Sequence, residues 1–129
     1  MVASYRELEV WQFAMDLSVD VYRLSESFPA DERFGLTSQL RRSSSSVAAN
    51  IAEGFGRESR AAFAQFLRVA RGSLHETETH VELALRLGYL TRDGAQELLG
   101  KADRIGRMMR GLLSSLTRHP EPGTPNPNG

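Results

Sequence analysis

The sequence has 129 residues and no cysteine, which excludes disulfides, thiolate metal sites and cysteine nucleophiles. It also has no apolar run near the roughly 18 residues that a membrane-spanning helix requires. The first residues, Met1–Glu9, do not show the basic-then-apolar order of a signal peptide. We therefore expect a cytoplasmic protein that does not enter a membrane, and its length fits one domain.

Patterns typical of metal sites and of catalysis are missing as well. No histidine follows a glutamate in the Glu-x-x-His spacing of di-iron bundles. Glu76 and His80 would share one helix face, but such pairs are usually solvated surface rather than metal ligands. The Gly54-x-Gly56 pair follows a helical pattern instead of a strand, which is not the context of a phosphate-binding loop. We expect no metal, no cofactor and no enzymatic activity.

Regular hydrophobic spacing is what the sequence does contain. One stripe advances in alternating steps of four and three residues, through Phe63, Leu67, Ala70, Leu74, Thr77, Val81, Ala84 and Gly88. An average step of 3.5 residues is typical of a helix packed lengthwise against other helices. A helix of this length cannot bury its stripe alone, so the pattern predicts a helical bundle.

Three more helices are expected from the same kind of spacing. The first spans about Tyr5 to Ser27 and ends before Pro29, which lacks an amide proton and restricts the residue before it. The second begins between 31 and 38 and ends near Gly54, and the fourth begins at Thr91. Their inner faces would comprise Val10, Ala14, Leu17, Val21, Leu24 and Phe28, then Leu36, Leu40, Val47 and Ile51, then Ala95, Leu98, Ala102, Ile105, Met109, Leu112 and Leu116.

The helix ends carry their own signals. Thr37 or Ser38 would cap the start of the second helix, and Ser59 and Thr91 would cap the third and fourth, because hydroxyl side chains accept the free amide protons there. A glycine in Gly54-Phe55-Gly56 would end the second helix in the left-handed conformation.

These four helices and their short connections predict an all-α fold, an antiparallel up-down-up-down four-helix bundle over residues 1–118. Residues 119–129, rich in proline and glycine, predict a disordered tail. The third helix also has a second apolar line, formed by Phe66, Val69, Leu85 and Leu87. That line suggests contact with a partner subunit, and the alternative is a broad core stripe.

The formal net charge is zero, but charge is unevenly distributed along the chain. Residues 33–72 hold seven arginines and two acids, and residues 104–129 hold four arginines and one acid. The segments 1–32 and 73–103 are acidic overall. The basic residues are fifteen arginines and one lysine, and arginine binds phosphates and carboxylates in bidentate fashion. The two basic blocks could form one face, unless the arginines only reflect the codons of a GC-rich genome.

The second helix and the turn after it carry a group of polar side chains, namely Gln39, Arg41, Arg42, Asn50, Glu53, Arg57 and Arg60. The helix macrodipole disfavours a carboxylate such as Glu53 near a C-terminus. We expect a cation to compensate it, and Arg57, Arg41 or Arg42, from the same or another subunit, could supply one. The structural interpretation is a polar lock that closes the turn, with Gln39, Asn50 and Glu53. The functional interpretation is a phosphate-binding surface made of the four arginines.

Several blocks occur in a recognisable order: Leu8-Glu9-Val10-Trp11-Gln12, Gly35-Leu36-Thr37-Ser38-Gln39-Leu40-Arg41-Arg42, Asn50-Ile51-Ala52-Glu53-Gly54 and Leu87-Gly88-Tyr89-Leu90. Over about residues 5–117 the chain resembles the bacterial four helix bundle protein family. That family includes proteins encoded within intervening sequences of 23S ribosomal RNA genes, and the accessory proteins of diversity-generating retroelements are related. It usually has apolar residues where this chain has Ser43, Ser44 and Ser45, so the second helix here is more polar.

The resemblance implies a bundle without catalytic activity that, in known relatives, forms a ring of five subunits. Retroelement accessory members bind nucleic acid and a reverse transcriptase through basic surfaces of the ring. The leading hypothesis is therefore a non-enzymatic homo-oligomer, a pentamer, that binds the backbone of RNA or DNA through Arg41, Arg42, Arg57 and Arg60. The alternative is a protein-interaction scaffold, in which the same arginines pair with acids of residues 1–32 across subunits.

Overall fold

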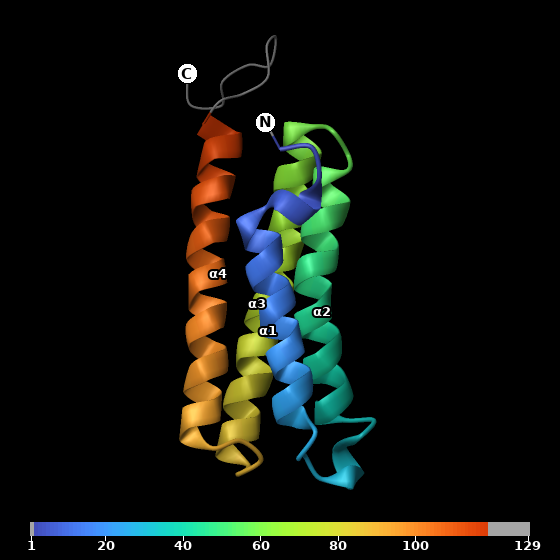
Figure 1. Ribbon diagram of the computed structural model, residues 1–129, viewed down its shortest axis with the longest axis vertical. Coiled ribbons are helices and arrows are strands. Elements are labelled where there is room, and N and C mark those ends of the chain that lie inside the picture. Colours follow the sequence, from blue (N-terminus) through green and yellow to red (C-terminus); the bar gives the residue numbers. More distant parts are fainter. Residues whose placement is uncertain (1, 119–129) are drawn as a thin grey trace.

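The computed structural model describes residues 2–118, which form four long helices joined by short turns (Figure 1). The helices are α1 (Glu9–Ser25), α2 (Leu36–Phe55), α3 (Arg60–Arg86) and α4 (Arg92–Arg118). Two short 3-10 turns, η1 (Tyr5–Glu7) and η2 (Ala30–Glu32), precede α1 and α2. Residues 2–118 contain no strand, so the predicted all-α bundle is confirmed. The expected tail, 119–129, lies outside the described residues.

Successive helices run antiparallel, and each packs against its neighbours in the chain (Figure 1). α1 contacts α2 and α4, and α3 also contacts α2 and α4. Among the described residues, the backbones of α1 and α3 do not approach each other closely, and neither do those of α2 and α4. The four helices therefore occupy the corners of a square in chain order, and α2 lies diagonal to α4.

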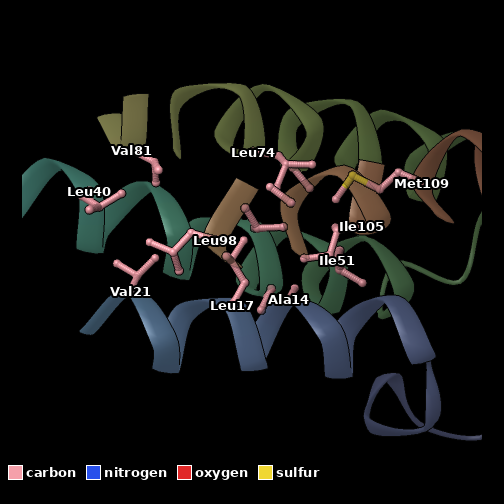
Figure 2. Close-up of a cluster of buried hydrophobic side chains, with 14 of the residues drawn as sticks. Ala14, Leu17, Val21, Leu40, Ile51, Leu74, Val81, Leu98, Ile105 and Met109 are labelled. Atoms are coloured by element: carbon pink, nitrogen blue, oxygen red, sulfur yellow. The ribbon is translucent and has the colours of Figure 1, made fainter. Parts of the chain in front are cut away.

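The core is built from the predicted apolar stripes. Figure 2 shows side chains from all four helices pointing into one shared interior, among them Leu17, Ile51, Leu74 and Ile105. Most of the predicted inner-face residues are buried, but Leu24, Phe63, Leu112 and Leu116 are half-buried and Gly88 is exposed. At the end of α4 the buried residue is Leu113 rather than Leu112. The reason is geometric, because an α-helix with 3.6 residues per turn drifts away from a 3.5-residue repeat.

The second apolar line expected on α3 does not form one continuous surface. Phe66 and Leu85 are half-buried, whereas Val69 and Leu87 are exposed. Phe66 packs against Gly54 of α2, and Leu85 packs against the core. Part of the line therefore widens the core stripe, and part of it remains at the surface.

The serines of α2 pack against both neighbouring helices. Ser43 and Ser44 are buried, and each donates a hydrogen bond to the carbonyl three residues earlier. Ser44 Oγ also lies 3.3 Å from Ser18 Oγ of α1, and Ser43 Oγ lies 3.0 Å from Thr77 Oγ1 of α3. Ser45, by contrast, is exposed. Short hydroxyl side chains therefore occupy core positions of α2 and bond across both of its interfaces.

The turns confirm two predicted caps and correct one prediction. Ser59 Oγ accepts a backbone hydrogen bond of 3.3 Å at the start of α3, and Thr91 Oγ1 accepts one of 3.0 Å at the start of α4. The expected left-handed glycine after α2 is wrong, because Gly56 is right-handed with φ −71° and Glu58 has φ 59° instead. α2 ends at Phe55 and Gly56 keeps a right-handed backbone, so the left-handed residue comes two positions later, at Glu58. A left-handed glycine does follow α3, at Gly88 with φ 80°.

The start of α2 also differs from the prediction. Neither Thr37 nor Ser38 caps it, because the helix already begins at Leu36. The carboxylate of Glu32 caps the helix instead, because its Oε1 accepts a hydrogen bond of 3.1 Å from the Leu36 amide. Glu32 Oε2 also accepts a bond of 3.0 Å from the Tyr89 hydroxyl. One carboxylate thus ties the start of α2 to the turn between α3 and α4.

Candidate nucleic-acid interface

Arg41 is bound to α1 within the same chain. Its Nε donates a hydrogen bond of 2.9 Å to Ser25 Oγ, and its Nη2 donates one of 3.3 Å to the Tyr22 carbonyl. Its guanidinium also lies over the Tyr22 ring, 4.6 Å from the centroid. A cation at the C-terminal turn of α1 is favourable, because the last carbonyls of a helix lack partners there. Arg41 therefore holds α1 against α2 while keeping its charge near the surface.

The Arg42 side chain is exposed, and its guanidinium has no hydrogen bond or ion pair within residues 2–118. It borders two hollows of the surface. One hollow, of about 490 Å³, also contains Tyr22 and Phe34. The other, of about 330 Å³, lies between α2 and α3 and contains Gln39 and His80. An exposed guanidinium in this position is available to a phosphate oxygen.

At the other end of α2, Arg57 pairs with Glu53. The distance from Arg57 Nη2 to Glu53 Oε1 is 2.8 Å, and both side chains are about half exposed. Such a surface pair contributes only about 0–1 kcal/mol to stability, but it supplies the cation that a carboxylate at a helix C-terminus requires. Arg57 also lies 5.2 Å from the ring centroid of Phe66. Arg60 is exposed at the first position of α3.

The structure does not bring the three polar lock residues together. Asn50 Nδ2 donates to the carbonyl and the hydroxyl of Ser46 at 2.8 and 2.9 Å, and Gln39 lines the hollow between α2 and α3. The 20 residues of α2 span about 30 Å, so Gln39 and Glu53 lie near its opposite ends. The candidate arginines divide in the same way into two separate pairs, Arg41 with Arg42 and Arg57 with Arg60.

The arginines of α2 and those of α4 lie on helices that are diagonal to one another, so these two parts of the basic blocks do not share one surface. The second half of α4 lies beside the first half of α3, where Leu74 approaches Gly106. This antiparallel alignment places Arg110 of α4 near the level of Arg68 and Arg71 of α3. These arginines were not predicted as site residues. Their signal lay in the two basic blocks, but only the pairing of α3 with α4 places them at a similar level of the bundle.

Two further side chains of the surface were not predicted from the sequence. Phe34 is 87% exposed, and the Arg33 guanidinium lies 5.3 Å from its ring centroid. Both belong to the connection between α1 and α2 and line the same hollow as Arg42. The available signal was the order Arg33-Phe34-Gly35, an aromatic residue between a cation and a glycine that no helix stripe includes.

Within residues 2–118, no group of three or more histidine, aspartate or glutamate side chains is arranged to hold a metal ion. None of the helices described is long and apolar enough to cross a membrane. Every buried side-chain nitrogen and oxygen in this part of the chain has a hydrogen-bond partner. The polar groups available to a ligand are therefore at the surface.

The sequence and the fold are both similar to those of known proteins. The model of the 23S rRNA-intervening sequence protein family matches residues 6–111, which include α1, α2, α3 and most of α4. The chain belongs to this family. It is also similar to a crystal structure from Bacteroides thetaiotaomicron VPI-5482, a protein of unknown function from the S23 ribosomal protein family. The TM-score is 0.73 at 26% identity, over 81% of this chain and 97% of that chain. None of the curated proteins compared matches the sequence.

Several residues that carry the family resemblance have structural roles in the bundle. Arg41 joins α2 to α1, and Gly88 provides the left-handed turn after α3. At Gly54 a Cβ atom would lie 2.5 Å from the Cβ of Phe66, so only glycine fits without a shift. These motifs of the 23S rRNA-intervening sequence protein family thus describe how the helices are held together.

Proposed function

We propose that this 23S rRNA-intervening sequence protein is a non-enzymatic, oligomeric bundle that binds the backbone of RNA or DNA through arginine-rich surfaces. The observation that carries the proposal is a set of exposed arginines that have no carboxylate partner among the described residues. They are Arg6, Arg33, Arg42, Arg68, Arg92, Arg104, Arg110 and Arg118. Guanidinium groups bind phosphate oxygens, and phosphate contacts dominate the affinity of proteins for nucleic acids.

Exposed apolar side chains support the oligomer. Met15 and Val19 of α1 are 40% and 44% exposed, and Val69 and Leu83 of α3 are 46% and 45% exposed. Because α1 and α3 lie at diagonal corners, these apolar faces point in different directions. Two unlike faces favour a head-to-tail interface, which generates a ring when the rotation between subunits closes. We propose five subunits, the number that the family resemblance implies.

Assembly explains how a chain without net charge could attract a polyanion. A ring repeats every free arginine in each subunit, so a local basic patch becomes an extended positive surface with a stronger field. Binding of this kind releases counterions and weakens steeply as salt is added. We place this activity in the cytoplasm, as the composition predicts.

A filter-binding titration with labelled RNA and DNA, from low to moderate salt, tests the proposal. Arg42→Glu reverses a free, exposed arginine, whereas Arg86→Glu makes the same change of charge at an arginine that pairs with Glu82. We expect Arg42→Glu to weaken binding by about tenfold, the effect of one charged hydrogen bond, and Arg86→Glu to have less effect. The absence of binding at low salt, or an equal loss of affinity in the two variants, would overturn the proposal.

A protein-interaction scaffold is the second candidate function. Asp16 of α1 and Glu26, the residue that follows this helix, are exposed and form no ion pair within the described part of the chain, so they could receive an arginine from a neighbouring subunit. If Arg42 has that role, Arg42→Glu should lower the mass of the assembly in light scattering, whether or not nucleic acid is present. In the leading proposal the mass stays constant and only the affinity for nucleic acid falls.

A further inference from the structure

The hollow between the end of α1 and the start of α2 combines arginines with exposed aromatic rings. It measures about 490 Å³, and its lining includes Tyr22, Arg33, Phe34, Ser38, Arg41 and Arg42. No acidic side chain of residues 2–118 lines it, so three guanidinium groups give the hollow a positive potential. Its volume lies within the range of about 300–1,000 Å³ that is usual for small-molecule sites, so part of a nucleotide can enter.

Binding of the phosphate backbone alone gives no role to Phe34. This side chain is 87% exposed, the highest value among the large hydrophobic residues of the described chain. A single exposed ring is ordinary on a protein surface. Here, however, a second ring, Tyr22, is 46% exposed in the same hollow, and both rings lie beside arginines. Aromatic rings next to cations are the combination that proteins use to bind single-stranded nucleic acid.

The backbone that carries Phe34 is anchored in spite of the exposure of its ring. Glu32, two residues earlier, accepts the amide of Leu36 at 3.1 Å and the hydroxyl of Tyr89 at 3.0 Å. The amide of Gly35, the next residue, donates a bond of 2.9 Å to the Glu32 carbonyl. The ring is therefore presented from a turn that is tied to α2 and to the turn between α3 and α4. Such preorganisation lowers the entropic cost of binding.

We propose that this hollow binds single-stranded RNA or DNA, with one unpaired base stacked on Phe34 and adjacent phosphates on Arg33 and Arg42. The inference rests on the proposed function and specifies the form of nucleic acid. Bases inside a duplex stack on one another, whereas the bases of a single strand can offer a face to an aromatic ring. Nucleic acid also supplies the negative charge that three arginines require. If a second copy of the chain occupied the hollow instead, its acidic side chains would have to supply that negative charge.

Fluorescence anisotropy of the full chain tests the inference, with one labelled strand measured both alone and as a duplex. Phe34→Ala removes the ring and Phe34→Trp keeps a stacking surface. Val2→Ala is the control, since Val2 is apolar, 42% exposed and outside both the hollow and the proposed interface faces. We expect Phe34→Ala to weaken single-strand binding by about 5- to 150-fold, the effect of one stacked base, and to leave duplex binding unchanged. Phe34→Trp and Val2→Ala should both bind like the wild type.

A fluorescent base analogue in the strand, 2-aminopurine, reports stacking directly, and its emission should fall with the wild type but not with Phe34→Ala. If the wild type binds nucleic acid at low salt and Phe34→Ala binds the single strand equally well, the stacking inference is wrong while the proposed function stands. If the wild type binds neither form, the proposed function itself is wrong. If Phe34→Ala lowers the mass of the assembly, Phe34 contacts another copy of the chain, and the inference is again wrong.

Discussion

Gly54 marks a close approach between α2 and α3. A Cβ atom added there would lie 2.5 Å from Phe66 Cβ and 3.2 Å from Phe63 Cδ1. Gly72, on the exposed side of α3, has no such neighbour within 4 Å of an added Cβ. The same change from glycine to alanine should therefore have opposite effects at these two positions.

We expect Gly54→Ala to lower the free energy of unfolding by about 1–3 kcal/mol, because overpacking forces the two helices apart. Gly72→Ala should raise it by about 0.5–1 kcal/mol, since alanine has the higher helix propensity and the space is open. Chemical denaturation followed by circular dichroism measures both changes. A stabilising Gly54→Ala would show that α2 and α3 are farther apart than described.

Tyr89 links the two turns at one end of the bundle through its hydrogen bond to Glu32. That bond, more than desolvation and the nearby charges of Glu32 and Asp31, raises the pKa of Tyr89 above the ordinary value of 10.0. A pKa raised by folding stabilises the protein at lower pH, and this contribution is lost as pH rises from 10 through the pKa of the folded state.

Above pH 10 the free energy of unfolding should therefore fall more steeply for the wild type than for Tyr89→Phe, which has no hydroxyl proton to lose. Denaturation curves of the two proteins at a series of alkaline pH values measure the difference. Parallel pH profiles would show that the hydroxyl of Tyr89 does not couple to folding.

Among the elements, the helix interiors were predictable and the helix ends were less so. The burial of α3 depends on local spacing alone, because a residue every 3.5 positions returns to the same face. The start of α2 depends instead on Glu32 of η2, whose carboxylate accepts a hydrogen bond from the Leu36 amide. This contact is set by the path of the chain between η2 and α2. Spacing contains no information about that path. The hydroxyl caps at Ser59 and Thr91 were predictable because each acts on its own helix.

The candidate site shows the same division between local and tertiary information. Sequence spacing located a basic block around Arg41 and Arg42, but it could not tell which guanidinium is free. That distinction arises because Arg41 lies on the side of α2 that meets Tyr22 and Ser25 of α1. The register between two helices decides it, and no local pattern encodes that register.

The hydroxyl contact between α1 and α2 gives a test of their pairing. Ser44 Oγ can donate to the Arg41 carbonyl at 3.0 Å, whereas the only hydrogen bond of the Ser18 hydroxyl within the described residues is the one to Ser44. Ser44→Ala would leave the largely buried Ser18 hydroxyl without a partner, at a cost of about 1–2 kcal/mol. Ser18→Ala should lower the free energy of unfolding by less, because the Ser44 hydroxyl keeps its bond to the Arg41 carbonyl.

The double variant Ser18→Ala/Ser44→Ala should then recover about 0.5–1 kcal/mol relative to the sum of the two single changes, because both polar partners are removed together. Urea denaturation of the four proteins completes the cycle. Strict additivity would mean that the two hydroxyls do not interact in solution.

For the whole molecule, the proposed ring predicts an asymmetric interface. Val19→Gln alters the exposed face of α1 and Val69→Gln alters that of α3, and neither changes the charge of the chain. Each variant alone should be a monomer, because every interface then contains one altered face. A mixture of the two should form dimers, since one intact face remains on each protein. Light scattering distinguishes this outcome from an interface between identical faces, for which mixing restores nothing.

The salt dependence of RNA affinity, compared between the wild-type assembly and monomeric Val69→Gln, tests most directly whether assembly creates the binding surface. The logarithm of the affinity falls with the logarithm of salt concentration by about 0.7–0.9 per phosphate neutralised, so the slope counts phosphate contacts. Both proteins carry the same charge per chain. We predict a steep slope for the assembly and a shallow slope with weak binding for the monomer. Equal slopes and affinities, or no binding by the wild-type assembly at low salt, would contradict the proposal.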